Sequence, residues 1–166
     1  MKKILIVFLI IITFSGCSIK KTNELTDAEK FSHEYKVSLK NPFKYTSLNN
    51  IYNIINKGNG IIFIGKADSD FCNQNVKILL DITKDKKIDC IYYYNPTKIL
   101  LNNKKEVNKL LDKLDVDKKN ELLGTYFIKD GKLIGSNNSI LEYFEDEEYL
   151  SNVKDKYIKL LDIYNK

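Results

Sequence analysis

The chain contains three cysteines, and one of them stands where a thiol could react. Cys72 follows a short apolar run, Ile61 to Ile64, and then Gly65, and it begins a segment with apolar residues at helical spacing. A cysteine near the start of a helix can have a lowered pKa, because the helix dipole and free amide groups stabilise the thiolate. The chemistry to consider first is therefore thiolate attack on a disulfide or a peroxide.

Two neighbouring features oppose such reactivity. Asp68 and Asp70 place negative charge beside Cys72, which disfavours the thiolate. Cys90 lies in the next expected strand, 88–94, and a Cys72–Cys90 disulfide would suit an exported protein. We expect their Cα separation to exceed the limit of about 7 Å for a disulfide. Cys90 is interpreted as a small buried residue, and the disulfide stays an open alternative.

Other chemistries find less support in the composition. His33 is the single histidine and has no Cys/His cluster near it, so we expect a surface residue, with no metal site and no cofactor. It also lies far before Ser69 in a different element, which gives no indication of a hydrolase triad. The basic residues are all lysine, and the net charge of +5 is too small to indicate nucleic-acid binding.

The N-terminus has the layout of a signal peptide. Lys2 and Lys3 precede an apolar run, Ile4 to Phe14, that is shorter than the roughly 20 residues needed to span a bilayer. Ser15-Gly16-Cys17 resembles the lipobox of bacterial lipoproteins, although Phe14 replaces the usual leucine. The resemblance implies a signal at 1–16, acylation of Cys17, a tether at 17–24 and attachment to the outer face of the cell membrane. Ordinary secretion is the alternative.

The elements around Cys72 follow from local patterns. The β-branched run before Gly65 and residues 88–94 predict two strands, and the helix between them implies a right-handed parallel crossover. Asp130-Gly131 predicts a tight hairpin between strands at 125–129 and 132–136.

Further helices are expected from capping signals and apolar spacing, and the C-terminal pattern from Ile140 to Leu161 indicates one broken helix or two consecutive helices. Thr26 with Glu29 forms a capping box for the first, and Ser47 and Gly58 bound the second. The last helix should begin with the acidic run Glu145 to Glu148. The inward residues expected in these helices are Leu25, Ala28, Phe31 and Tyr35; Leu48, Ile51, Ile54 and Ile55; Val107, Leu110, Leu111 and Leu114; and Ile140, Leu141, Phe144, Leu150, Val153, Tyr157, Leu160 and Leu161.

This order of elements is similar to that of the thioredoxin fold. Residues 60–80 resemble the strand, Cys-x-x-Cys loop and helix of thioredoxin-like proteins, and residues 125–132 resemble their strand and hairpin after the cis-proline. Asn41-Pro42-Phe43 and Gly58-Asn59-Gly60 also resemble small thioredoxin-like lipoproteins of Gram-positive bacteria, some described as bacteriocin transport accessory proteins. The resemblance implies an α/β domain at 25–166, with a mixed sheet of about four strands and helices on both faces.

Two positions depart from the pattern of that family. Ser69 stands where the resemblance implies the nucleophilic cysteine, and a serine hydroxyl cannot form a mixed disulfide. Gly124 stands where the cis-proline would be, and glycine does not enforce a cis bond. A Ser-x-x-Cys pattern is also similar to the Thr-x-x-Cys of peroxiredoxins, but the arginine that this chemistry needs is missing from the chain.

We therefore expect a lipid-anchored binding or accessory module with a degenerate redox site. The resemblance implies that the surfaces around 66–72 and 123–126 face each other and bind an extended peptide or an envelope protein. The residues expected there are Asp68, Asp70, Phe71, Gly124 and Thr125. One alternative is one-cysteine redox chemistry through Cys72 with an external thiol, and another is a purely structural or immunity-type envelope protein.

Overall fold

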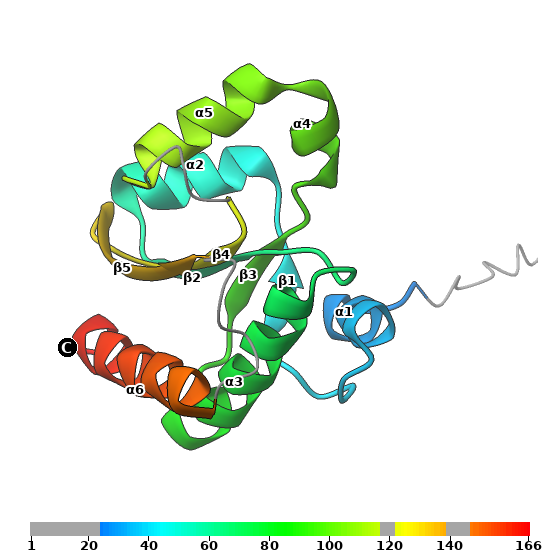
Figure 1. Ribbon diagram of the computed structural model, residues 1–166, viewed down its shortest axis with the longest axis vertical. Coiled ribbons are helices and arrows are strands. Elements are labelled where there is room, and N and C mark those ends of the chain that lie inside the picture. Colours follow the sequence, from blue (N-terminus) through cyan, green and yellow to red (C-terminus); the bar gives the residue numbers. More distant parts are fainter. Residues whose placement is uncertain (1–23, 117–121, 139–146) are drawn as a thin grey trace, which may run out of the picture.

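The computed structural model describes residues 24–116, 122–138 and 147–166 (Figure 1). Cys17 and the expected inward residues Ile140, Leu141 and Phe144 lie outside these ranges, as does Glu145. The elements are α1 (Asp27–Tyr35), β1 (Phe43–Tyr45), α2 (Leu48–Lys57), β2 (Gly60–Ile64), α3 (Asp70–Lys86), β3 (Ile91–Tyr94), α4 (Thr97–Asn102), α5 (Lys104–Lys113), β4 (Gly124–Lys129), β5 (Lys132–Asn138) and α6 (Glu147–Tyr164).

The sheet has the strand order β1-β3-β2-β4-β5. Strands β1, β3 and β2 are parallel, and β4 is antiparallel to both β2 and β5. All five residues of β2 are buried, as expected for the middle strand of a covered sheet. This strand order, with helices on both faces, is the thioredoxin-like fold that the sequence predicts.

Two details of the sheet correct the sequence-based expectation. The sheet has five strands instead of about four, because Phe43 to Tyr45 pairs with β3 at the edge. A three-residue strand shows too little alternation to be detected in a sequence. The strand expected at 88–94 begins only at Ile91, because the amide of Ile88 donates to the carbonyl of Thr83 and closes the end of α3 instead.

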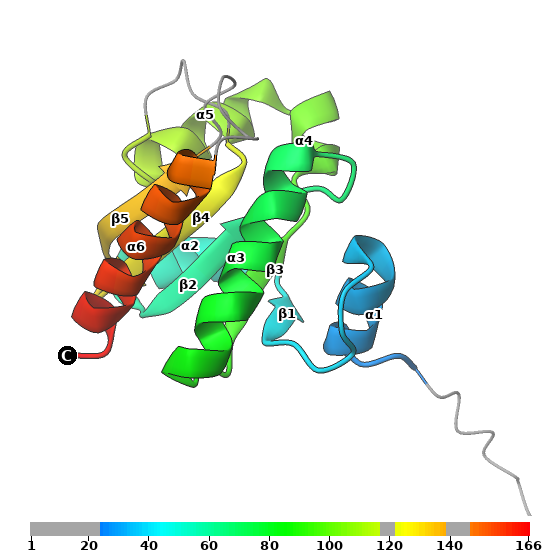
Figure 2. The same cartoon turned by 60° about the horizontal axis from the view of Figure 1, so that its bottom comes forward.

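Helices cover both faces of the sheet. Helices α1, α3 and α6 lie on one face and α2, α4 and α5 on the other (Figure 1), and α3 and α6 run side by side in both views (Figure 2). The core beneath α1, α3 and α6 is rich in aromatic residues, such as Phe31, which stacks on Phe43 with 3.9 Å between ring centroids. The opposite core consists mainly of isoleucine and leucine.

The predicted helix starts are formed by side-chain caps. The amide of Thr26 donates to Glu29 (2.7 Å) and the amide of Glu29 donates to the Thr26 hydroxyl (3.3 Å), which confirms the capping box. Leu25 was wrongly expected on the inward face, because it precedes α1 and is 46% exposed. The first turn of α6 contains Glu147 and Glu148, in agreement with the predicted acidic start.

The hairpin between β4 and β5 has the turn that its sequence predicts. Asp130 and Gly131 both have positive φ angles, 51° and 70°, as a two-residue type I′ turn requires. The turn also rests on the α2–β2 connection, where Gly131 N–H donates to the Gly58 carbonyl (2.9 Å) and Asp130 N–H to the Asn59 side chain (2.6 Å). A Cβ on residue 131 would lie 2.6 Å from the Asn56 carbonyl oxygen, so only glycine fits.

The described helices and strands all lie between Asp27 and Tyr164. A chain that begins at Ser18 therefore keeps every described helix and strand and both cores. Within the described ranges, no helix has the length and apolar character needed to cross a bilayer.

Candidate functional site

The loop between β2 and α3, residues 65–69, lies where the parallel strands end. The amide of Gly65 donates to the carbonyl of Tyr94 (3.1 Å), which ties the loop to the end of β3. A Cβ on residue 65 would lie 2.6 Å from the Phe63 ring and 3.0 Å from the Tyr35 hydroxyl. A side chain at residue 65 would have to displace these rings, so close packing favours glycine there.

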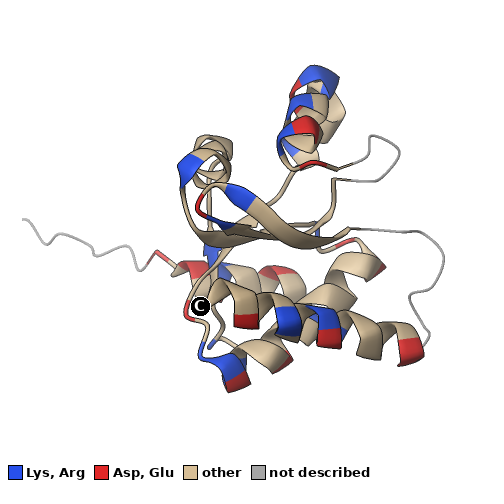
Figure 3. Ribbon diagram, turned by 90° about the vertical axis from the view of Figure 1, so that its left-hand side faces the viewer, with Lys and Arg blue, Asp and Glu red and all other residues tan. Residues whose placement is uncertain are grey.

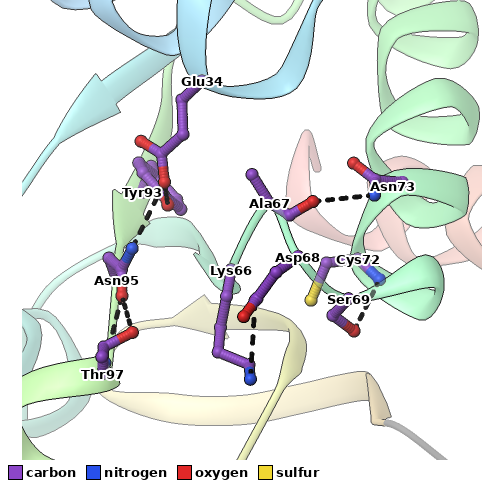
Figure 4. A network of polar contacts seen from close by, with 10 residues as sticks. All are labelled: Glu34, Lys66, Ala67, Asp68, Ser69, Cys72, Asn73, Tyr93, Asn95 and Thr97. Carbon is purple, nitrogen blue, oxygen red and sulfur yellow. Dashed lines mark hydrogen bonds and ion pairs between the residues drawn. The ribbon is translucent and has the colours of Figure 1, made fainter.

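Ser69 is the N-cap of α3. Its hydroxyl accepts a hydrogen bond from the amide of Cys72 (3.4 Å), and its carbonyl accepts one from the amide of Asn73 (3.0 Å). The side chain of Asn73 donates in turn to the carbonyl of Ala67 (3.0 Å), as Figure 4 shows. The position expected to hold a redox nucleophile is therefore filled by a residue that begins the helix, a role well suited to serine. We did not predict this cap from the sequence.

The side chain of Cys72 is completely buried. Its exposed fraction is 0%, and it belongs to the core shared by α1, α3 and α6. The thiol lies close enough to Tyr35 and Tyr157 for a negative charge on it to raise the pKa of both phenols, although burial is the main cause of those shifts. A molecule in solution reaches this sulfur only if the start of α3 opens.

Cys90 lies at the opposite end of the strands. It immediately precedes β3, which corrects the expectation of a mid-strand position, and it is half-buried beside Tyr92. Because Ile62 pairs with Tyr92, Cys90 is level with Gly60, whereas Cys72 follows the other end of β2. The length of β2 separates them by about 13 Å at 3.3 Å per residue, well beyond the reach of a disulfide. Both residues are thiols in the structure.

The exposed part of the loop is charged. Lys66 and Asp68 form an ion pair of 3.5 Å, and their side chains are 32% and 78% exposed. Asp70, the first residue of α3, is also exposed. Such an exposed pair contributes little to stability. Lys66 was not among the residues predicted from the sequence.

The predicted site residues converge at this edge, but only some reach the surface. The register pairs Phe63 with Thr125 and Ile64 with Gly124, which places the start of β4 beside the end of β2. Thr125, Gly124 and Phe71 are buried, so Asp68 and Asp70 are the exposed members of the predicted set.

Gly124 serves the packing of the hairpin. A Cβ on this residue would lie 2.6 Å from the carbonyl oxygen of Asn137 and 3.0 Å from the Cα of Asn138. No cis peptide bond occurs in the described residues.

A buried polar cluster lies one turn below Cys72. The side-chain NH2 of Asn75 donates to the carbonyl of Phe71 (3.0 Å), and the side-chain oxygen of Asn75 accepts from the side chain of Asn137 (3.2 Å) and from the Tyr157 hydroxyl. Burial is the main cause of the raised pKa of Tyr157. The cluster joins α3, β5 and α6. The sequence held one signal for it, an asparagine at a core position of an amphipathic helix.

A second polar group stands across from the loop (Figure 4). The carboxylate of Glu34 accepts hydrogen bonds from the hydroxyls of Tyr93 (2.5 Å) and Tyr45 and from the side chain of Asn95 (3.2 Å). Burial is the main cause of the raised pKa of both phenols, which therefore stay protonated and donate. The group fixes α1 against the ends of β1 and β3. No local sequence pattern indicates it, because its members come from separate elements.

In the ranges 24–116, 122–138 and 147–166, no three His, Cys, Asp or Glu side chains are placed to hold a metal ion. His33 lies exposed on α1.

Comparison with known proteins gives a weak structural similarity. No model of a protein family matches the sequence, and no curated protein matches it. Among solved structures, the chain is similar to thioredoxin O1 from Arabidopsis thaliana in the oxidized state, with 13% identity and a TM-score of 0.43. The similarity covers 70% of this chain and 97% of that one. The fold described above rests on the order and register of the strands themselves.

Proposed function

We propose that this protein is an exported, lipid-anchored accessory module that uses a thioredoxin-like scaffold for binding and does not exchange disulfides. The observation that carries this proposal is the burial of the Cys72 thiol behind a helix start capped by Ser69. Disulfide exchange needs a thiolate that can reach another sulfur atom. Neither the hydroxyl at 69 nor the sulfur at 72 meets that requirement.

The binding surface in this proposal is the charged edge formed by Lys66, Asp68 and Asp70. Thr125 and Phe71 are buried, so they are not part of this exposed edge. The partner is an extended peptide or an envelope protein that lies along this edge.

The proposal is tested by restoring the missing thiol. Ser69→Cys creates a Cys-x-x-Cys sequence and should give the chain insulin-reducing activity in the presence of dithiothreitol, whereas the unmodified chain should show none. Ser69→Thr is the matched control, because it keeps a capping hydroxyl without adding sulfur. Insulin reduction by the unmodified chain would contradict the proposal.

The competing function is one-cysteine redox chemistry through Cys72. It is tested in a Cys90→Ser chain that begins at Ser18, so that Cys72 is the single thiol. We expect iodoacetamide to modify Cys72 only as fast as the protein opens, with rates that increase in urea. Rapid modification below pH 7 without urea would favour the redox function instead.

The anchor is tested separately. Cys17→Ala should move the protein from the membrane fraction to the medium or the periplasm, because the acyl chains supply most of the membrane affinity. Ser18→Ala is the control and should leave the protein in the membrane fraction. Unchanged retention of Cys17→Ala would exclude lipidation as the means of attachment.

A further inference from the structure

Helices α4 and α5 form the outermost layer on their side of the sheet (Figure 1). Residues 100–105, which include the end of α4 and the start of α5, are all exposed. Leu101 is 76% exposed and Leu100 40%, and Leu101 is the most exposed large apolar residue in the described ranges. Ile99 alone in α4 is buried, so packing of the fold does not explain why two leucines follow it.

Lysines lie close to these leucines in the sequence. Lys98 lies three residues before Leu101, on the same side of α4. A hollow along α5 is lined by four more lysines, Lys104, Lys105, Lys109 and Lys113, together with Glu106 and Asp112. Two of these lysines also contact α2, since Lys109 Nζ lies 4.5 Å from the centre of the Tyr52 ring and Lys113 donates to the Asn56 side chain (3.4 Å). The blue segments at the top of Figure 3 include those of α5. We call the exposed leucines and these five lysines the α4–α5 surface.

The acidic residues of α5 do not cancel this charge. Between residues 97 and 113 there are five lysines and two acids, Glu106 and Asp112. Glu106 is held by the Tyr52 hydroxyl (2.6 Å) and lies 3.6 Å from Lys109. These contacts hold its pKa below the usual range, with the Tyr52 hydrogen bond as the main cause. The surface keeps a net positive charge around an apolar centre.

We propose that the α4–α5 surface docks on an anionic lipid bilayer. Exposed leucines enter the boundary between headgroups and acyl chains, and lysines around them are attracted to negative headgroups. Lysine suits this role because it acts as a point charge and needs no fixed geometry. In water alone, two exposed leucines add nothing to the stability of the fold.

The proposal rests on the proposed lipid anchor in one respect, because the anchor would keep the domain close to the membrane. Seven peptide steps separate Cys17 from Glu24, so the lipid would hold the domain within about 25 Å of the membrane at 3.3 to 3.6 Å per residue. At that effective concentration a weak surface contact is sufficient. The contact would orient the domain and turn the opposite face of the sheet outward.

The test uses the chain from Ser18, which carries no lipid. We expect it to sediment with vesicles of phosphatidylcholine containing about a third phosphatidylglycerol, and to bind pure phosphatidylcholine at least tenfold more weakly, since each lysine near an anionic surface contributes about fivefold. Binding should weaken at high salt. Lys104→Glu/Lys105→Glu should reduce it by about 25-fold or more, and Leu101→Ser by about threefold or more.

Matched variants on α6 serve as controls. Lys156→Glu/Lys159→Glu makes the same change of charge on exposed residues, and Ile163→Ser removes an exposed apolar residue that is 47% accessible. Both should bind almost as well as the unmodified chain. Equal binding to neutral and anionic vesicles, no binding to either, or equal losses in the α6 variants would overturn the proposal. Because the chain lacks residue 17, these outcomes are independent of the Cys17→Ala experiment.

Discussion

The two faces of the sheet are built from different kinds of residues. All five buried serine, threonine and asparagine residues of the described ranges belong to the face with α1, α3 and α6, namely Ser32, Asn75, Thr83, Thr125 and Asn137. Eight buried aromatic residues share that core. The face with α2, α4 and α5 is packed mainly by aliphatic side chains, with Tyr126 as its buried phenol. We call these the polar face and the aliphatic face.

The difference indicates which face fixes the relative positions of the helices and strands. Aliphatic packing stabilises a fold and tolerates exchange between similar shapes. A buried amide must find its partners, which fixes the relative positions of the elements that supply them. The candidate site at Ser69 and Cys72 lies on the polar face, where Asn75 holds α3, β5 and α6 in one arrangement. Four experiments test this comparison.

The largest effect is expected on the aliphatic face. Leu110 is 0% exposed, so Leu110→Ala should lower the free energy of unfolding by about 3 kcal/mol, from lost burial and the cavity left behind. Urea unfolding followed by circular dichroism measures it. Leu101→Ala, at a 76% exposed site, is the control and should change stability by about 0.5 kcal/mol or less. Similar losses in both variants would mean that this face is not a packed core.

On the polar face the second largest effect should come from Asn75→Ala. The change removes the acceptor of the Tyr157 hydroxyl and the Asn137 amide and should cost about 2 kcal/mol, because both donors stay buried. Adding Tyr157→Phe should recover about 1 kcal/mol, since one unsatisfied donor is then gone. Simple additivity of the two changes would show that the cluster does not act as a unit.

Alkaline pH should lower the free energy of unfolding through the buried phenols of both faces, with the larger contribution from the polar face. Burial raises the pKa of Tyr35, Tyr93 and Tyr157 on the polar face and of Tyr126 on the aliphatic face. Phenols in the unfolded chain titrate near pH 10. The contribution of the four buried phenols to the free energy of unfolding is therefore complete below about pH 10 and is lost as the pH rises above it. Each phenol should add about 1.4 kcal/mol per pH unit to the slope.

Single Tyr→Phe variants separate these contributions. Tyr157→Phe and Tyr126→Phe each remove one titrating phenol. Each change should therefore reduce the slope of the unfolding free energy against pH, measured between pH 10 and 11.5, by up to about 1.4 kcal/mol per pH unit. Stability that does not change over this range would contradict the burial of the phenols.

The smallest effect concerns the start of α3. Ser69→Ala removes the cap of the Cys72 amide and should lower stability by about 1 kcal/mol, while Ser69→Asp should stay within a few tenths. Thermal unfolding measures both. If Ser69→Ala did not change stability, the hydrogen bond from the Cys72 amide to the serine would not stabilise the helix start, and capping would not explain why a serine occupies this position.

The sequence predicted those features that depend on neighbours along the chain. The Thr26–Glu29 capping box, the Asp130-Gly131 turn and the buried strand before Gly65 each have a local signature, and the structure contains all three. Strand β1 and helix α4 were missed because three and six residues carry too little periodicity.

The polar groups of the candidate site were missed for a different reason. Asn75 and Tyr157, like Glu34 and Tyr93, meet across large separations in the sequence, and no local pattern records such contacts. The cap formed by Ser69 was visible in principle, since a serine three residues before an inward helical position is a typical helix start. Its interpretation as a lost cysteine concealed that role.

The place of β2 in the sheet has a consequence for how the chain acquires its structure. Residues 60–64 are wholly apolar apart from Gly60, and they pair with β3 on one edge and with β4 on the other. Synthesis proceeds from the N-terminus, so one edge of this strand stays open until residues 124–129 have emerged. An unpaired edge of an apolar strand can form hydrogen bonds with a strand of another chain, which leads to aggregation. The last quarter of the chain, which begins with β4, is therefore needed to close this edge and to protect the preceding residues from aggregation.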